Sequence, residues 1–256
     1  MPAGSENPRS NGGGPAVLAL DPWTAGPAPG KPHQLLTEEE RARLATIASV
    51  VRFKKGAEIY RGGDPTNAIF NIVSGVVKSC SGTDGDHIVA FLFPGDLLGL
   101  SAEGAYVNSA RAITPVTAYR LPTAVLQRRL SKDALLEYHV ICKLCQELRQ
   151  TQRHALLLAH RRAEVKVATF LQLLEQLQLA RDEPDGEIYI PMDRSDIADY
   201  IGMSLPAVSR TFRKMAERGV IANRNRHHTK VLDRAAFERI VMGGREARGV
   251  TKSAAE

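Results

Sequence analysis

The sequence predicts an α+β chain in which a small all-β sandwich or roll precedes a long helix and a mixed C-terminal domain. Three observations predict it. Short β-type runs separated by turn residues fill Val51 to Leu121, a helical period of apolar residues begins at Ser131, and a helix–turn–helix pattern spans Ser195 to Met215. A chain of 256 residues is long enough for two modest domains of this kind.

The bulk composition predicts a cytoplasmic protein with a polyanionic partner. The formal net charge is +6 and the isoelectric point is about 9.3. No run of eighteen apolar residues is present, so we expect no membrane span, and the N-terminus lacks the pattern of a secretory signal. Three cysteines, an odd number in a chain this long, do not make a disulfide framework and fit a reducing compartment.

The N-terminal part is expected to contain a tail, one helix and the β-roll. Residues 1–33 are rich in Gly, Pro, Ser and Asn and predict a disordered tail. Thr37 and Glu40 form a capping-box pattern that predicts a helix from Thr37 to Ser49. Residues 34–130 form the β-roll, with Asp84-Gly85 as a strong hairpin signal. Four glycines stand where strands should end: Gly56, Gly63, Gly75 and Gly95.

Residues 131–160 predict one long helix with two apolar stripes. One stripe can pack on the β-domain while the other meets a second copy of the chain, which predicts a homodimer. The alternative is a single amphipathic helix buried within a monomer. The first stripe, the predicted dimer interface, is Ile141, Leu144, Leu148, Thr151, Ala155 and Leu158. The second stripe is Leu135, Tyr138, Cys142 and Cys145.

Residues 161–242 predict a winged helix-turn-helix, followed by a flexible tail over 243–256. A helix from Ala163 to Leu179 and a short strand, EIYIPM, come first. Asp193 can cap a helix that runs from Arg194 to about Ile201. After the second helix, VIAN and TKVLD predict two strands around the turn RNRHH. Five residues are spaced to hold the two helices together: Ile197, Ile201, Val208, Phe212 and Met215.

The turn between these two helices has residues suited to each position. Gly202 is placed for the left-handed conformation that ends the first helix. Ser204 can cap the second helix, and Pro206 falls in its first turn, where a missing N–H does no harm.

The second helix and the wing predict contacts to double-stranded DNA. Arg210 can make a bidentate contact to guanine or clamp a phosphate, and Ser209 can reach a phosphate or base edge. The segment from Ile190 to Ile240 contains ten Lys or Arg residues and six Asp or Glu residues, which gives a net charge of +4. The alternative is a solvated basic face. Further candidates on these elements are Pro206, Ala207, Arg213, Lys214, Arg194, Ser195, Arg224, Arg226, His227 and His228.

From about Lys54 to Asp233 the chain resembles the cAMP receptor protein/FNR (CRP/FNR) family of bacterial transcription regulators. The motifs include GAEIYRGGDP, FLFPGDLLGL, ARAITPVTAYRLP and RSDIADYIGMSLPAVSRTF. The resemblance implies a β-roll sensor domain (a double-stranded β-helix of the cyclic-nucleotide-binding kind), a long dimerisation helix and a winged helix-turn-helix. It also implies a homodimer that binds a palindrome and contacts RNA polymerase. We expect an activator, and repression stays open as the alternative.

The effector motifs of the family are altered. Its cyclic-nucleotide binders hold the ribose with a Gly-Glu pair and the phosphate with an Arg-Ser or Arg-Thr pair. This sequence has Gly95-Asp96, or Gly99-Leu100, at the first position and Tyr106-Val107 near the second. Neither Tyr106 nor Val107 can balance a phosphate charge, and Arg111 fits a structural strand position better. We therefore expect no cAMP, and we read Asp96 as a turn residue.

The iron–sulfur motif is also missing, because residues 1–79 contain no cysteine. The expectation is an FNR/FixK-like regulator without a cAMP or [4Fe–4S] cofactor and without a metal site. Two alternatives stay open: a sensor gated by an unidentified ligand or haem in the β-roll, and a redox sensor using Cys80 or the pair Cys142 and Cys145. The histidines show no ligand spacing, and no constellation of residues supports catalysis.

One departure lies inside the second helix. FNR- and FixK-like proteins carry Glu-x-x-Ser-Arg there, and the glutamate accepts hydrogen bonds from bases. In this sequence Ser209 and Arg210 are retained while Pro206 replaces the acidic reader. The base that the glutamate reads should therefore be less constrained.

Overall fold

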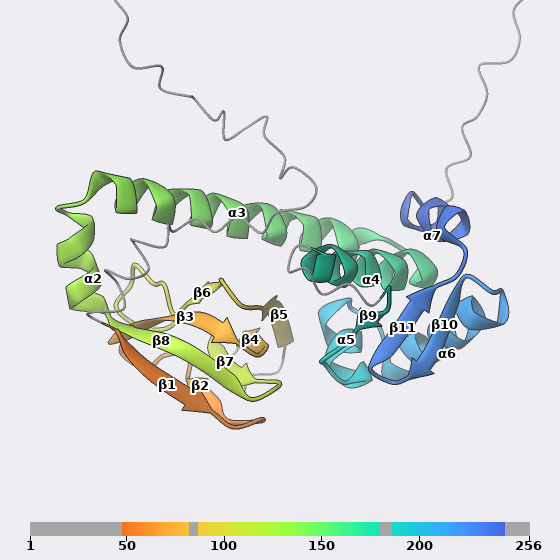
Figure 1. The fold of residues 1–256 in the computed structure, drawn as a ribbon, viewed down its shortest axis with the longest axis horizontal. Helices are drawn as coiled ribbons and strands as arrows, with labels where there is room; N and C mark the ends of the chain where they lie inside the picture. Colours follow the sequence, from red (N-terminus) through yellow and green to blue (C-terminus); the bar gives the residue numbers. More distant parts are fainter. Residues whose placement is uncertain (1–47, 82–86, 180–185, 244–256) are drawn as a thin grey trace, which may run out of the picture.

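The computed structural model describes residues 48–81, 87–179 and 186–243 and confirms the predicted α+β architecture (Figure 1). A long helix runs past both domains, with the β-roll under its first part and the winged helix-turn-helix under its end. Several predictions lie outside the described residues, namely the tail 1–33, the tail beyond Gly243, the hairpin tip Asp84-Gly85 and most of the helix predicted from Thr37. The predicted end of that helix is wrong, because Ser49 opens a strand.

The β-roll consists of two four-stranded antiparallel sheets. Alternate residues of the strands point inward, so that Ala68, Phe70 and Ile72 pack in one buried cluster with Val116 and Ala118. One sheet has the order β1 (Ser49–Phe53), β8 (Val116–Pro122), β3 (Ala68–Ser74) and β6 (Leu97–Leu98). The other has the order β2 (Glu58–Tyr60), β7 (Ser109–Ala112), β4 (Val77–Ser81) and β5 (His87–Leu92).

The predicted turns are present at the ends of the strands. Strands β4 and β5 pair from Ser81 opposite His87 onward, which confirms the predicted hairpin on both sides of its tip. Gly75 has a φ of +91°, and a Cβ there would lie 2.2 Å from the carbonyl oxygen of Pro115. Only glycine fits at this position.

A short helix, α2 (Thr123–Leu130), follows β8 and was not predicted. Its N-cap is Pro122, whose side chain makes no capping hydrogen bond, and only Leu126 is buried. The sequence therefore carries neither a cap signal nor an apolar stripe at this point.

The long helix is α3 (Ala134–Ala159), capped by Asp133, whose side chain accepts a hydrogen bond of 3.0 Å from the amide of Leu136. The residues that α3 buries within the chain are Leu136, Lys143 and Leu157. The predicted dimer stripe is exposed, and Leu148 shows 59% of its surface. The expectation that one of the two stripes packs on the β-domain is wrong, because Leu135 and Tyr138 of the second stripe are exposed as well.

The C-terminal domain is a helical bundle with a three-stranded sheet of order β10-β11-β9. Its apolar core includes Phe170, Ile197, Val208, Met215 and Phe237. The last helix was not predicted, although Asp233 caps it by accepting from the amide of Ala236. The elements are α4 (Ala163–Leu179), β9 (Ile188–Tyr189), α5 (Arg194–Tyr200), α6 (Leu205–Glu217), β10 (Ile221–Asn225), β11 (His228–Val231) and α7 (Arg234–Val241).

Across the described parts of the chain, no helix is both long and apolar enough to span a bilayer.

Candidate DNA-recognition surface

The turn between α5 and α6 has the predicted geometry. Gly202 adopts a φ of +61°, and the amide of Met203 donates to the carbonyl of Ala198 at 2.8 Å. The hydroxyl of Ser204 accepts from the amide of Ala207 at 3.4 Å, and Pro206 lies in the first turn of α6. The capping role predicted for the Asp193 side chain is wrong, because that side chain makes no capping hydrogen bond at the start of α5.

Helix α6 has one buried face and one exposed polar face. Val208, Phe212 and Met215 are buried against the core, as predicted. The polar face is therefore free to enter a groove of DNA. The exposed residues of this face, which we call the reading face, are Pro206, Ser209, Arg210 and Arg213. Ala207, one of the predicted contacts, is half-buried beside them.

Arg194 at the start of α5 lies against α6, the helix that carries the reading face and that we call the reading helix. Its guanidinium carbon is 3.3 Å from the centroid of the Phe212 ring. Burial lowers the pKa of this guanidinium to about 10, so the side chain stays charged at neutral pH. Its Nη1 is buried and has no hydrogen-bond partner among the described residues. Ser195, next to it, is exposed.

Two cations near the end of α6 are paired with Glu164 of α4. Lys214 lies 2.9 Å and Arg218 lies 2.7 Å from its carboxylate oxygens. The hydrogen bond from Lys214, aided by Arg218, holds the pKa of the Glu164 carboxyl below its usual value. Both cations are largely exposed, so these pairs are weak and a DNA phosphate can compete for the same cations.

The wing consists of β10, β11 and the turn between them, and β10 extends to Asn225, two residues beyond the predicted strand. In this turn the Nδ1–H of His227 donates to the carbonyl of Ile190 at 2.8 Å, while its Nε2 accepts from the Nε of Arg226 at 3.0 Å. His228 packs on the Tyr189 ring, and exposed Arg224 lies 3.3 Å from Glu187. His227 therefore orients Arg226 at the edge of the wing.

Two side chains that are absent from the predicted sites hold the turn in place. Lys166 of α4 is buried, and its Nζ donates to the carbonyls of Ile201 at 2.9 Å and Gly202 at 3.3 Å. His154 of α3 lies flat on the Tyr200 ring at 4.0 Å, and its Nε2 is 2.6 Å from the Tyr200 carbonyl oxygen. The Lys166 ammonium thus sits at the carbonyl end of α5, where the helix dipole favours a cation. The one available signal was Lys166 between two buried valines.

In the β-roll, the residues at the expected effector positions make contacts within the chain. The Asp96 carboxylate accepts from the amide of Phe93 at 2.8 Å, as expected of a turn residue, and also binds the Lys143 ammonium of α3 at 2.6 Å. Tyr106 is buried, donates to the carbonyl of Ala68 at 2.8 Å and stacks on Tyr60 at 3.9 Å.

Gly99 and Arg111, near these positions, also lie against other parts of the chain. A Cβ at Gly99 would lie 2.9 Å from the Tyr106 ring, so this stretch of backbone packs directly on the tyrosine. Val107 is exposed. Arg111 lies on β7, opposite Glu58 of β2, in the structural strand position that we expected.

The cysteines lie in two places. Cys80 is buried on β4, and burial raises the pKa of its thiol, which lowers the fraction of reactive thiolate. On α3, Cys142 is half-buried and Cys145 is exposed. Within the described ranges no group of three or more His, Cys, Asp or Glu residues could hold a metal ion.

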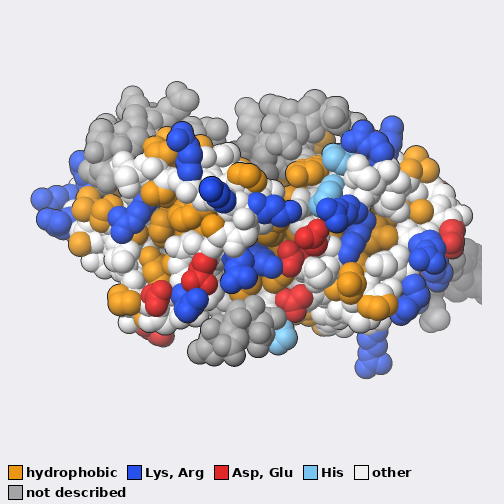
Figure 2. Space-filling view, turned by 90° about the horizontal axis from the view of Figure 1, so that it is seen from below, with side chains coloured by type: hydrophobic (Ala, Val, Ile, Leu, Met, Phe, Trp, Pro, Cys, Tyr) orange, Lys and Arg blue, Asp and Glu red, His pale blue; other side chains and the backbone are white. Residues whose placement is uncertain are grey.

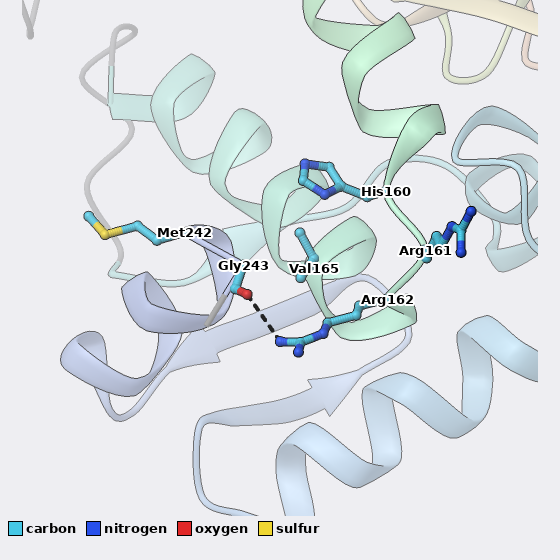
Figure 3. A pocket seen from close by; sticks show the side chains of 6 residues that line it. All are labelled: His160, Arg161, Arg162, Val165, Met242 and Gly243. Atoms are coloured by element: carbon cyan, nitrogen blue, oxygen red, sulfur yellow. Dashed lines mark hydrogen bonds between the residues drawn. The ribbon is translucent and has the colours of Figure 1, made fainter. Parts of the chain in front are cut away.

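A basic hollow lies at the junction of α3 and α4, beside the end of α7 (Figure 3). It is lined by His160, Arg161, Arg162 and three further residues, and Arg162 donates to the carbonyl of Gly243 at 3.0 Å. His160 is exposed and is the C-cap residue of α3.

Comparison with known proteins supports the same reading. Residues 165–240 match the Crp-like helix-turn-helix domain, and residues 50–133 match the cyclic nucleotide-binding domain. The nitrogen fixation regulation protein FixK of Bradyrhizobium diazoefficiens is 35% identical over 67% of this chain and 73% of its own length. The transcriptional activator protein Anr of Pseudomonas aeruginosa is 31% identical over 73% of this chain and 79% of its own length.

Among solved structures, FixK2 from Bradyrhizobium japonicum superposes with a TM-score of 0.69 and 28% identity over 76% of this chain and 97% of its own. Sequence, fold and recognition helix thus agree. The chain belongs to the CRP/FNR family and is a helix-turn-helix, DNA-binding transcription regulator.

Proposed function

We propose that this regulator acts as a homodimer that binds a palindromic promoter site and activates transcription without cyclic nucleotide, iron–sulfur cluster or other effector. The observation that carries the proposal is the apolar stripe on α3. It runs along a helix of 26 residues, on the side away from Leu136, Lys143 and Leu157, which pack within the chain.

A second copy of the chain is the natural partner for this stripe. Its large side chains recur every three or four residues, as in a coiled-coil seam, and include Ile141, Leu144, Leu148 and Leu158. Withdrawing such a side chain from water contributes about 1.5–3 kcal/mol. A two-fold axis along this seam presents two copies of α6 to two half-sites of a palindrome.

On each half-site we assign base reading to Arg210 and Ser209, both exposed on the reading face. Arg194, Ser195, Arg213 and Lys214 would bind phosphates around them, and Arg226 would do so from the wing.

Independence from an effector is supported by the contacts in the β-roll. The carboxylate of Asp96 is engaged by Lys143 and by the amide of Phe93, and Tyr106 packs on Tyr60 and Gly99. Asp96 and Tyr106, at the expected effector positions, are therefore already bonded to or packed against other residues of the chain. The name of Anr supports activation, which requires contact with RNA polymerase in the cytoplasm.

The test is the mass and DNA stoichiometry of the purified protein in light scattering. We expect a dimer that binds one palindromic duplex, and a monomer with far weaker binding for Leu148→Asp. Val50→Asp, which changes an equally exposed valine on β1, should remain a dimer. A monomeric wild type would contradict the proposal. Calorimetric titration with cAMP, cGMP and haemin should show no binding, and binding of any of them would overturn effector independence.

A further inference from the structure

Helix α5 is held from the side opposite the reading helix by the sensor domain. The carboxylate of Asp199 accepts the backbone amide of Ile88 on β5 at 2.5 Å. Its other oxygen lies 3.2 Å from the Nδ1 of His87, the first residue of the same strand. One carboxylate thus binds both the backbone and a side chain of a strand more than a hundred residues away in sequence.

One turn earlier on α5, Asp196 makes a second contact. Its carboxylate lies 2.8 Å from the Nζ of Lys78 on β4, the strand that pairs with β5. The two side chains are only 19% and 23% exposed, so this ion pair is better shielded from water than a surface pair. Figure 2 shows acidic and basic side chains side by side where the β-roll meets the C-terminal domain.

An apolar contact lies beneath these polar ones. Phe91 of β5 packs against Tyr200 of α5 at 4.8 Å and against Phe170 of α4 at 6.2 Å between ring centroids. Ile88 and Phe93 of the sensor belong to the same buried cluster as the core of the C-terminal domain. The β4–β5 hairpin and α5 therefore pack as one unit.

This contact joins the two domains independently of the chain segment that links them. The chain connects the two domains through His160, Arg161 and Arg162, the three residues between α3 and α4. Three linking residues do not fix the orientation of the C-terminal domain, so its non-covalent contacts with the rest of the chain must do so. The residues of the reading face stay exposed while the hairpin is docked on α5, so the docked domain can still bind DNA.

We propose that Asp196 and Asp199 are positioning residues through which the sensor hairpin fixes α5, and with it the distance between the two reading helices of the dimer. The proposal rests on the homodimer proposed above. It predicts that docking sets which half-site spacing the protein accepts, although neither residue belongs to the reading face. Without docking, only a fraction of the molecules hold both helices at the correct separation, and the apparent affinity falls by that fraction.

The experiment compares operator duplexes whose half-sites keep the native spacing or are moved apart by two base pairs. Asp196→Lys should reduce the preference for native spacing at least fivefold. The charge-swapped double variant Lys78→Glu with Asp196→Lys should restore that preference to within twofold of wild type. Glu238→Lys, an equal charge change on exposed α7, should leave it unchanged. A general loss of stability would weaken both duplexes alike and would not be rescued by the swap.

A second measurement needs neither DNA nor a dimer. The amide of Ile88 should exchange with solvent at least tenfold faster in Asp199→Ala than in wild type. Unchanged Ile88 exchange, an unchanged spacing preference in Asp196→Lys or a failed rescue would overturn the docking role. The two proposals can also fail separately. If the wild type is a monomer but its Ile88 amide is protected and becomes exposed in Asp199→Ala, the homodimer is refuted and the docking contact is upheld.

Discussion

Lys143 of α3 and Asp96 of the turn after β5 form an ion pair of 2.6 Å whose side chains are only 10% and 16% exposed. The pair ties the long helix to the β-roll at the position where the family's ligand-binding residues are altered. A charge left unpaired in such a place is costly, because it keeps its desolvation penalty and loses its partner.

The variant Lys143→Met should therefore lower the free energy of unfolding by about 3–5 kcal/mol, the usual cost of breaking a buried pair by removing one partner. Urea titration followed by circular dichroism measures this. Lys132→Met, which removes an exposed lysine just before α3, should change it by less than about 0.5 kcal/mol. Equal effects of the two substitutions would show that the pair contributes no more than a surface lysine.

Glu147, one turn further along α3, should make stability depend on pH. Burial raises the pKa of its carboxyl to about 7, the Lys143 ammonium partly opposes this rise, and the Asp96 carboxylate reinforces it. Since this folded value lies above the unfolded value of 4.5, the folded protein keeps a proton that the unfolded chain releases. The contribution of Glu147 to stability is therefore greatest below pH 4.5 and is lost as pH rises to about 7.

Glu147→Gln stays neutral at every pH and isolates this effect. We expect the variant to gain stability relative to wild type between pH 5 and pH 8, by more than about 1 kcal/mol, since each pKa unit corresponds to about 1.4 kcal/mol. Urea midpoints at several pH values give the difference. Parallel curves for the two proteins would contradict the buried, protonated carboxyl.

Pro206→Glu should sharpen sequence discrimination. Pro206 stands in the first turn of α6, exposed, where family members carry a base-reading glutamate. An acidic residue is also favourable in the first turn of a helix, so the substitution should not unfold α6. Binding-site selection should yield one half-site position that is degenerate for wild type and defined for the variant. A wild-type site that is already fully defined at every half-site position would refute this prediction.

Arg210→Ala should weaken binding to the selected site by about 1–3 kcal/mol, or roughly 5- to 150-fold, and relax specificity at one base pair. Arg239→Ala removes the same charge from exposed α7 and should have a much smaller effect. Fluorescence anisotropy at fixed salt gives both values, because phosphate contacts make affinity steeply salt-dependent. If the alanine variant lost affinity equally for all sequences, Arg210 would be a phosphate contact and not a base reader.

The sequence allowed prediction of the recognition domain because its signals are local. Gly202, Ser204 and Pro206 each meet a conformational requirement of one turn, and the buried residues of α5 and α6 keep a helical period. Helix α2 carried no comparable signal. Helix α7 does carry one, an Asp233 cap followed by an apolar Phe237, but the stronger strand pattern before it masks this signal.

The contacts between elements could not be predicted, because they depend on tertiary packing. Lys143 and Lys166 look like solvated helix residues in sequence, yet both are buried and bind oxygen atoms on distant segments. Asp196 and Asp199 look like ordinary polar residues of a recognition domain and prove to face the sensor. A helical period identifies the apolar face of a helix but not what covers its polar face.

The most direct test of effector-independent DNA binding is binding-site selection with purified wild-type protein in the absence of any added effector, at a stated salt concentration. We expect a defined palindrome, bound by a dimer with equal affinity in the presence or absence of cAMP. Weak binding without sequence preference, converted to tight binding by an added ligand, would contradict it.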